Sequence, residues 1–562
     1  MAWRAITGLL GSMSTPAISA SLVAILSLCV AMRFLRDADA GLDPREPPLA
    51  HSRVPFVGHM IKLLRHHNAY FSQLHASQPH PITTLKILSQ RIYIISSPAL
   101  VQAAFRASKT VDFEIVKATA SCKAVNFSPH TTGIVRAPPD PERGNSNYML
   151  DLHREMYGAL MGEDLLETNA KLLNCLAAAL NRVGGAWEGK KLFRWLRTFY
   201  SVASAEALYG ARNPIQADEK LVPMIWDFEK ELGLLVLNVF PAITARKGHR
   251  ARVKMTTAFE EYVSVSYSRT PLAGLSRDPR HYHVRESANL GASPQYHAGF
   301  NKNASGFIKG RERCARKWGM TTTEIAKADI SILFAAVTNT VPNVYFMICY
   351  LFSDVHLLAA LRSEVEGIVR REGEKVVLSI GAVRERCPLL TGCFQETLRL
   401  VKTGASVRVV LEDTMLAEQY LLKKGAVVEI PTGLLQSDST TWGPDAKEFD
   451  PYRWIEAKSM HREDREKRKV QSQAFVPFGG GKNLCPGRHL AFNEITAFVA
   501  MVVWGFEIRG GDGRTLEAQR GGVCNLGDGS TSPKGDLDVS IRRREGFEGV
   551  VFEFDVGGVV AE

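Results

Sequence analysis

The sequence predicts a mainly α-helical body with a smaller β-rich region, preceded by an N-terminal transmembrane helix. Apolar patterning continues along the 562 residues without a long low-complexity linker, which favours one large body over several domains. Two uncharged runs, Ala5–Met32 and Ile330–Leu351, have the length of long helices. Alternating apolar residues at Leu537–Ile541 indicate a half-buried strand, and Phe547–Phe554 is its expected partner.

The first predicted element is a membrane anchor over residues 1–36. Ala5–Met32 is long enough to cross a hydrocarbon core of roughly 30 Å as a helix. Arg33 and Arg36 follow the span and only Arg4 precedes it, so the body is expected in the cytosol. A cleaved signal peptide is the alternative, but its usual basic segment is thin here.

Residues 37–60 are predicted to form a proline-rich connector, and residues 61–562 the body. Closely spaced prolines lack backbone donors and favour a stiff, extended chain. The net charge of +11 comes from basic residues spread along the chain, and in residues 461–469 they alternate with acids, as in an exposed loop. A nucleic-acid partner is therefore not expected. Nine scattered cysteines also argue against a zinc site or a disulfide framework.

The run Ile330–Leu351 is predicted to be a buried helix with a kink. It is apolar enough to be a second membrane span, which is the alternative. Its middle, however, contains amides and hydroxyls that lipid tolerates poorly. Pro342 removes one backbone hydrogen bond and predicts the kink.

The chemistry of the chain is predicted from Cys485, which lies in the glycine-rich segment Phe478–Gly487. The apolar, helix-like run Leu490–Val503 begins just after it. Glycines let backbone amides approach the sulfur, and the N-terminus of a following helix favours the thiolate, the form that binds metals. An ordinary buried cysteine is the alternative, but a core has no use for the surrounding glycines.

This segment resembles the haem-binding loop of the cytochrome P-450 superfamily, Phe-x-x-Gly-x-x-x-Cys-x-Gly. Phe478, Gly481, Cys485 and Gly487 fill its fixed positions. The resemblance covers about residues 40–556 and implies a cytochrome P-450 fold of the microsomal type. It also implies that Cys485 is the axial ligand of the iron of haem b, iron protoporphyrin IX, and that the other three residues bind this cofactor.

Three charged residues match a cluster that supports the cysteine loop in this family. Glu396 and Arg399 have the i, i+3 spacing of one helix face, and Arg453 follows in the segment Phe449–Trp454. The resemblance implies a buried structural cluster beneath the haem. Removing one member is expected to leave the others unpaired, at a cost of roughly 3–5 kcal/mol.

Thr340 and Asn339, in the long apolar helix, are the predicted catalytic residues. The commonest family pattern is an acid followed by a threonine, and this chain has Asn339 in place of the acid. An amide cannot exchange a proton as a carboxylic acid does, so Asn339 is expected to order a water beside Thr340. The Asn-Thr-x-Pro run resembles the branch that holds sterol 7α-hydroxylases and their fungal secondary-metabolism relatives.

Arg408 and His153 are the predicted basic contacts to the haem. Asn483 stands where many relatives carry a basic residue, and Arg408, on a β-rich stretch, can supply a charged donor instead. The Trp-x-x-x-Arg pattern expected near residue 150 is missing. His153 and Arg154 are the nearest basic candidates, although a surface pair is an equally good account of them.

The resemblance implies a monooxygenase that hydroxylates or otherwise oxidises an apolar small molecule in a fungal secondary-metabolite pathway. Its family places substrate contacts at Ser406, Val407, residues 116–127 and residues 335–340, where nothing demands an ionic ligand. Dioxygen and NADPH-derived electrons are the expected co-reactants, with NADPH–cytochrome P-450 reductase and cytochrome b5 as implied partners. The expected location is the endoplasmic reticulum membrane, with a single span and a cytosolic body.

Two alternatives remain open at this stage. The first is a haem-thiolate isomerase or dehydratase that acts on a peroxide without external electrons, and Asn339 motivates it. The second is a non-catalytic haem-binding sensor.

Overall fold

The computed structural model describes residues 42–52, 58–87, 90–267, 303–455, 462–519, 521–522, 524 and 529–557. The predicted anchor over residues 1–36 lies outside the described residues. Within the predicted connector, residues 47–50 run along the first strand of the molecule, where the amide of Thr84 donates to the carbonyl of Pro48 at 2.8 Å. The helix that follows, α3, begins at Gly58.

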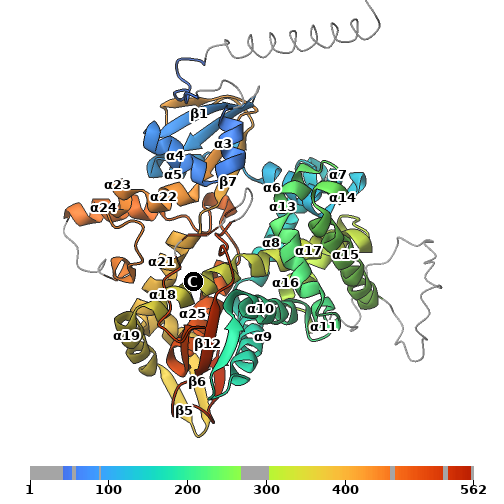
Figure 1. The fold of residues 1–562 in the computed structure, drawn as a ribbon. Coiled ribbons are helices and arrows are strands. Elements are labelled where there is room, and N and C mark those ends of the chain that lie inside the picture. Colours follow the sequence, from blue (N-terminus) through green and yellow to red (C-terminus); the bar gives the residue numbers. More distant parts are fainter. Residues whose placement is uncertain are drawn as a thin grey trace, which may run out of the picture.

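Four sheets make up the β-rich part of the described chain. The largest has the order β1 (Ile82–Ile87), β2 (Gln90–Ile95), β10 (Val427–Pro431), β7 (Ala405–Val410), β3 (Val111–Asp112). A second sheet has the order β11 (Phe506–Gly510), β12 (Asp538–Arg543), β4 (Glu188–Lys191). A third has the order β13 (Val551–Asp555), β6 (Lys375–Ser379), β5 (Val369–Glu372). The fourth pairs β8 (Thr414–Leu416) with β9 (Tyr420–Leu422). Figure 1 shows the largest sheet at one end of the molecule, apart from most of the helices.

The strand predicted near the C-terminus is confirmed, but its predicted partner is wrong. β12 pairs antiparallel with β11 and β4, whereas β13, within the predicted partner segment, pairs in parallel with β6. Alternation in the sequence shows which face of a strand is buried, not which distant strand it meets. One of the two strands that β12 does pair with, β4, has the sequence EGKK, in which apolar residues do not alternate with polar ones.

The helices of the first half are α3 (Gly58–His66), α4 (Ala69–Ser77), α5 (Pro98–Arg106), α6 (Glu114–Val125), α7 (Pro129–Arg136), α8 (Tyr148–Ala159), α9 (Gly162–Asn181), α10 (Leu192–Tyr209), α11 (Pro214–Ala217), α12 (Leu221–Lys230), α13 (Leu232–Leu237), α14 (Pro241–Thr244) and α15 (Arg246–Tyr267). Those of the second half are α16 (Gly306–Lys317), α17 (Thr322–Thr338), α18 (Thr340–Ser353), α19 (Val355–Glu366), α20 (Ile380–Arg386), α21 (Pro388–Val401), α22 (Thr432–Ser437), α23 (Ser439–Trp442), α24 (Arg462–Ala474) and α25 (Arg488–Gly505). Short 3-10 turns lie at η1 (Pro141–Arg143), η4 (Pro451–Trp454) and η6 (Gly481–Asn483).

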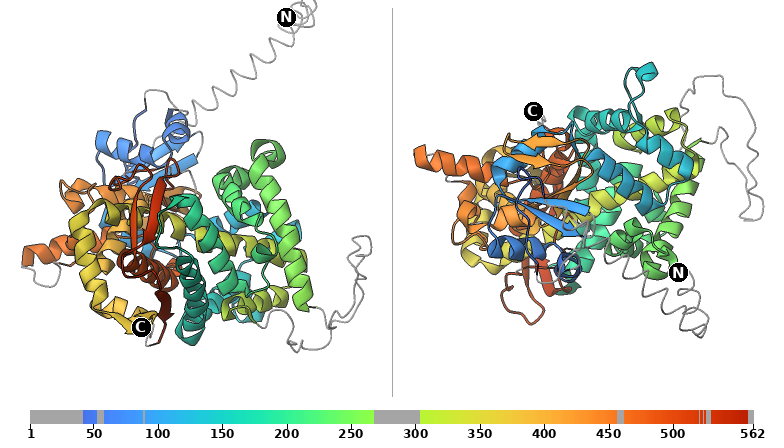
Figure 2. Two further views of the ribbon diagram at one scale, coloured as in Figure 1. Left: turned by 60° about the horizontal axis from the view of Figure 1, so that its bottom comes forward. Right: turned by 90° about the horizontal axis from the view of Figure 1, so that it is seen from above.

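The long apolar helix is buried and interrupted, as predicted. α17 and α18 cross the helical part of the molecule and are separated at Asn339 (Figures 1 and 2). The interruption lies three residues before Pro342, where the proline ring removes the bond to the carbonyl of Thr338. The segment Thr322–Ser353 is apolar enough to span a membrane, but 72% of its most apolar window is buried inside the protein. Among the described residues it is therefore a core helix.

The prediction of a loop over residues 461–469 is wrong, because the helix α24 covers most of this segment. Arginine, glutamate and lysine are good helix formers, and acids and bases three or four residues apart stabilise an exposed helix. Glu466 and Lys469 form such a pair, with 3.8 Å between the charged atoms. The C-terminal turn is anchored by the buried residues Gln471 and Ala474.

Candidate active site

Cys485 lies in a tight loop between η6 and α25. The amide of Cys485 donates to the carbonyl of Phe478 at 3.0 Å and closes the loop. Gly479 and Gly481 have φ angles of +74° and +64°, a left-handed conformation that other residues adopt only with strain. The glycine framing seen in the sequence is thus a requirement of the loop backbone.

Gly480 is required for a different reason, which is a close approach to α5. A Cβ atom at this position would lie 2.2 Å from the ring of Phe105. Phe105 is itself buried and lies beneath the guanidinium of Arg408, with 4.8 Å between the guanidinium carbon and the ring centroid. The cysteine loop, α5 and β7 are therefore packed as one unit.

The surroundings of the Cys485 thiol shift its pKa in opposite directions. Burial raises this pKa, while a hydrogen bond from the amide of Gly487 and the positive charges of Lys402 and Arg488 lower it. The predicted approach of a backbone amide to the sulfur is thus seen at Gly487, at the start of α25. Coordination to a metal cation deprotonates a thiol outright and overrides the effect of burial.

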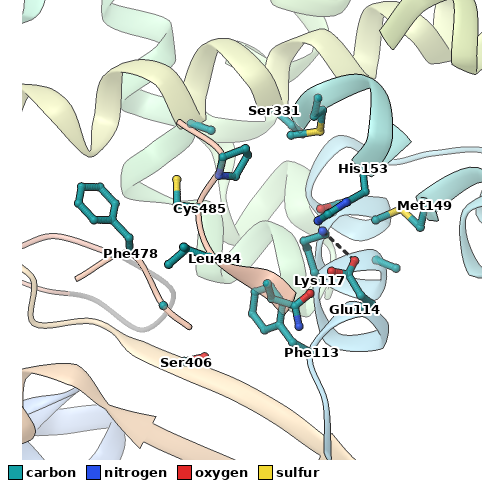
Figure 3. A pocket seen from close by; sticks show the side chains of 18 of the residues that line it. Phe113, Glu114, Lys117, Met149, His153, Ser331, Ser406, Phe478, Leu484 and Cys485 are labelled. Atoms are coloured by element: carbon teal, nitrogen blue, oxygen red, sulfur yellow. Dashed lines mark ion pairs between the residues drawn. The ribbon is translucent and has the colours of Figure 1, made fainter. Parts of the chain in front are cut away.

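A cavity of about 510 Å³ opens above Cys485. Figure 3 shows the side chains of Phe478, Cys485 and His153 around it, and Ser331 on the helix that passes above them. α17 forms the roof through Ala328, Ser331, Ile332 and Ala335. The predicted substrate-contact stretches also reach the cavity, at Ser406 of β7 and through α6, which contributes Glu114, Lys117, Ala118 and Ser121.

The three predicted support residues lie together in one buried cluster. Both Glu396 and Arg399 have fully buried side chains, and their charged atoms are 2.7 Å apart. Arg453 reaches the same carboxylate at 3.2 Å from η4. The indole of Trp454 donates to Glu396 at 2.9 Å, and the amide of Asp450 donates at 3.1 Å. One carboxylate thus ties α21 to η4.

Arg408 and His153 both line the cavity. The side chain of Arg408 is 2% exposed, its Nε has no hydrogen-bond partner among the described residues, and burial lowers its pKa to about 10. The ring of His153 packs against that of Tyr157 at a tilt of 31°, with centroids 4.2 Å apart, and the hydroxyl of Tyr157 donates to the carbonyl of Leu484, next to Cys485. Arg154, in contrast, is an exposed partner of Asp151.

The family model "Cytochrome P450" matches residues 47–523 of this chain. The chain belongs to the cytochrome P-450 family. The match covers most of the sequence and includes the cysteine loop, the charged cluster and the interrupted helix. The enzyme class predicted from the sequence, a cytochrome P-450 monooxygenase, is confirmed by this match and by the named relatives.

Curated relatives come from fungi and from mammals. The cytochrome P-450 monooxygenase nodJ of Hypoxylon pulicicidum is 29% identical over 92% of this chain and 93% of its own length. Cytochrome P-450 7B1 of Mus musculus is 23% identical over 83% of this chain and 85% of its own. The solved structure of a retinoic acid-bound cyanobacterial CYP120A1 aligns with a TM-score of 0.62 at 18% identity, over 89% of this chain and 99% of that one, and supports the fold.

The residues around the cavity fit the haem-thiolate cofactor of this family. Cys485 would supply the sulfur ligand, and Gly487 leaves space beside the sulfur, because a Cβ there would lie 3.9 Å from Sγ. Arg408 supplies a buried cation with an unpaired Nε, which suits an anionic group such as a haem propionate. Phe478 and His153 line the same space. These residues would hold the haem, and when bound it would supply the chemistry of dioxygen activation.

Thr340 is buried and Asn339 is partly buried near the roof, but neither is among the residues that line the cavity. The hydroxyl of Thr340 donates to Glu494 at 2.8 Å, and Asn339 accepts a bond from Lys402 at 2.9 Å. Glu494 is 3% exposed, and burial raises its pKa to about 8. This chain lacks the acid of the family pattern at position 339, but Glu494 on α25 places an acid next to Thr340.

Sequence reasoning missed both Glu494 and Lys402. Glu494 is separated from Thr340 by 154 residues and resembles any acid in the first half of a helix. Lys402, directly after α21, resembles an exposed helix-ending lysine. Only its strongly apolar surroundings in the sequence could have marked Glu494 as buried.

Proposed function

We propose that this chain is a haem b monooxygenase that hydroxylates or otherwise oxidises a largely apolar small molecule. Dioxygen is the oxidant, and NADPH supplies electrons through NADPH–cytochrome P-450 reductase, with cytochrome b5 as a further donor. The observation that carries the proposal is the Cys485 thiol, held by a glycine-framed loop beneath the cavity under α17. The fungal monooxygenases among the relatives support a role in a secondary-metabolite pathway.

Each part of the site has a defined task in this proposal. Cys485 would bind the iron, and Arg408 would bind an anionic edge of the cofactor. The cluster at Glu396 holds the cysteine loop through α21 and η4. A buried acid kept protonated by its surroundings can give up a proton at need. When Glu494 is protonated, the direction of its bond with Thr340 reverses: the acid donates to the hydroxyl oxygen of Thr340, and the Thr340 hydroxyl donates to the carbonyl of Ala336, 3.1 Å away. Glu494 can then pass its proton to Thr340. Asn339 does not exchange a proton itself.

Exposed apolar side chains support the proposed association with the endoplasmic reticulum membrane. Leu237 is 65% exposed, Phe240 76% and Ile243 79%, and all three lie at α13 and α14 on the outer edge of the helical part (Figure 1). An apolar patch of this kind suits contact with lipid. The patch is independent of the anchor over residues 1–36, and together they would hold the cytosolic body against the membrane.

The first test is spectroscopic and uses the full-length, haem-loaded protein. The ferrous carbonyl adduct should show the red-shifted Soret band of thiolate ligation, and Cys485→Ser should lose that band. Purified protein with reductase should then consume NADPH and dioxygen as product forms. Turnover of a peroxide without NADPH, reductase or dioxygen would instead support the isomerase alternative, and haem binding without either activity would support the sensor.

The second test concerns the proton path. Thr340→Ala should lower the ratio of product formed to NADPH oxidised several-fold, because it removes the hydroxyl that Glu494 contacts. Thr338→Ala is the matched control, since in the described part of the chain that buried hydroxyl bonds only to the carbonyl of Phe334 in the preceding turn. An unchanged ratio in Thr340→Ala would reject the assignment.

A further inference from the structure

Lys402 is a buried cation in the wall of the active-site cavity. Lys402 is only 8% exposed, and it lines the cavity together with Gly404, Ala405 and Ala335. These three neighbours carry no charge and present little more than backbone. Lysine is rarely buried to this extent without a partner.

The hydrogen-bond partner that the protein provides for the ammonium of Lys402 is neutral. Within the described part of the chain, Nζ of Lys402 donates to Oδ1 of Asn339 at 2.9 Å, and no carboxylate pairs with it. An ammonium has three donors, so one amide oxygen leaves it incompletely satisfied. Burial lowers the pKa of Lys402 to about 8, so the amine still carries a proton at neutral pH.

Asn339 is itself held firmly in this arrangement. Its Oδ1 also accepts a bond from the hydroxyl of Ser530 at 3.1 Å, and its carbonyl accepts a bond from Asn343 at 2.5 Å. The backbone of Gly529 approaches so closely that a Cβ there would lie 2.5 Å from the same Oδ1. Lys402 therefore has a fixed neutral support on one side and the cavity on the other.

Arg408 differs from Lys402 in its surroundings. It lies over Phe105 and Phe113 next to the cysteine loop, where the cofactor fits. Lys117, which also reaches the cavity, is already paired with Glu114 at 2.7 Å (Figure 3). The sulfur of Cys485 acts on the charge of Lys402 through space. Among the lysines described around the cavity, Lys402 is thus the one that has no carboxylate partner.

We infer that Lys402 is a substrate-recognition residue that binds a carboxylate on an otherwise apolar substrate. This inference rests on the proposed monooxygenase function and narrows its substrate class. The ammonium donates to a carboxylate oxygen, while the apolar wall around it accepts the hydrocarbon body. A neutral asparagine at position 339 suits this role, because an acid there would neutralise the lysine.

The test compares two probes of equal chain length, dodecanoate and 1-dodecanol, on the full-length haem-loaded protein at about pH 7. Their dissociation constants are measured from the substrate-induced shift of the Soret band and, independently, by calorimetry. Dodecanoate should bind the unaltered protein at least about tenfold more tightly than 1-dodecanol, since a charge-assisted bond in a buried site has that order of effect. Lys402→Met should remove this preference, and Lys402→Arg should restore part of it.

Two further variants separate the charge from the shape of the site. Asn339→Asp keeps the lysine but gives it a carboxylate partner, so it should weaken dodecanoate binding about tenfold and leave 1-dodecanol within twofold. Lys423→Met removes a lysine that is paired with Asp413 at 2.8 Å and is not among the residues that line the cavity, so it should leave the preference for dodecanoate unchanged. Equal affinity for the two probes, absent binding of dodecanoate, or an unchanged preference in Lys402→Met would overturn the inference.

The haem content of each variant is measured alongside the affinities. Loss of haem from Lys402→Met would assign the lysine to the cofactor and would also overturn the inference. A normal thiolate spectrum combined with no preference for dodecanoate would reject the role of Lys402 alone. Absence of the thiolate spectrum from the unaltered protein would instead reject the proposed function.

Discussion

Replacement of Glu396 by glutamine tests whether the buried cluster supports the cysteine loop. The two oxygens of this carboxylate accept bonds from five donors, at 2.7 and 2.8 Å from Arg399, 3.2 Å from Arg453, 2.9 Å from Trp454 and 3.1 Å from Asp450. Glutamine keeps the shape but turns one acceptor into a donor that faces a guanidinium. The free energy of unfolding should fall by roughly 3–5 kcal/mol, the usual cost of breaking a buried ion pair.

The size of this effect follows from where the positive charges remain. Arg399 is fully buried, and its other bonds are to the backbone carbonyls of Gln436, Ala446 and Glu448, which carry no compensating charge. Arg453 keeps a second carboxylate, Asp445, at 2.7 Å, so most of the cost falls on Arg399.

The assay is urea unfolding followed by the Soret band and by far-ultraviolet circular dichroism. Glu466→Gln is the control, because its pair with Lys469 is 74% exposed on the glutamate side and should contribute less than about 1 kcal/mol. If Glu396→Gln retains its haem and loses less than about 1 kcal/mol, the support role assigned to the cluster is wrong.

Two other predictions concern pH and packing. Since burial raises the pKa of Glu494 to about 8, the folded state holds a proton that the unfolded chain releases above about pH 4.5, and stability should fall as the pH rises from about 5 to 8. Urea unfolding across this range should show a flatter profile for Glu494→Gln, and parallel profiles would contradict the raised pKa. Gly480→Ala should lower haem content and thermal stability, because its Cβ meets the ring of Phe105, whereas Gly133→Ala, with open space around it, should not. Adding Phe105→Ala to Gly480→Ala should recover the haem content in part, and no recovery would place the defect elsewhere.

The sequence predicted those parts of the site whose chemistry depends on local spacing. The loop from Phe478 to Gly487 requires glycine at particular backbone angles, and the spacing of Glu396 and Arg399 places both on one helix face. Such constraints leave a readable pattern in a short stretch of sequence. The strand β12 and the interruption before Pro342 were predicted for the same reason.

The parts that were not predicted depend on contacts between distant segments. β13 pairs with β6 across more than 170 positions, and no local pattern records that choice. α24 was predicted as a loop because its charges suggested exposure, yet exposure and helix formation are compatible. Glu494 and Lys402 appear ordinary in sequence, and only the fold shows that both are buried beside Thr340 and Asn339.

The two adjacent positions 339 and 340 divide the work that the commonest family pattern gives to an acid and an alcohol. Thr340 contacts Glu494 of α25, and in the proposed mechanism this acid is the proton source, so it does not have to precede the threonine in sequence. Position 339 is then free to carry a neutral amide that supports Lys402 without neutralising it. An acid at position 339 would duplicate Glu494 and cancel the lysine. The departure from the family pattern at Asn339 is therefore better explained by a change in what the cavity binds than by a loss of oxygen chemistry.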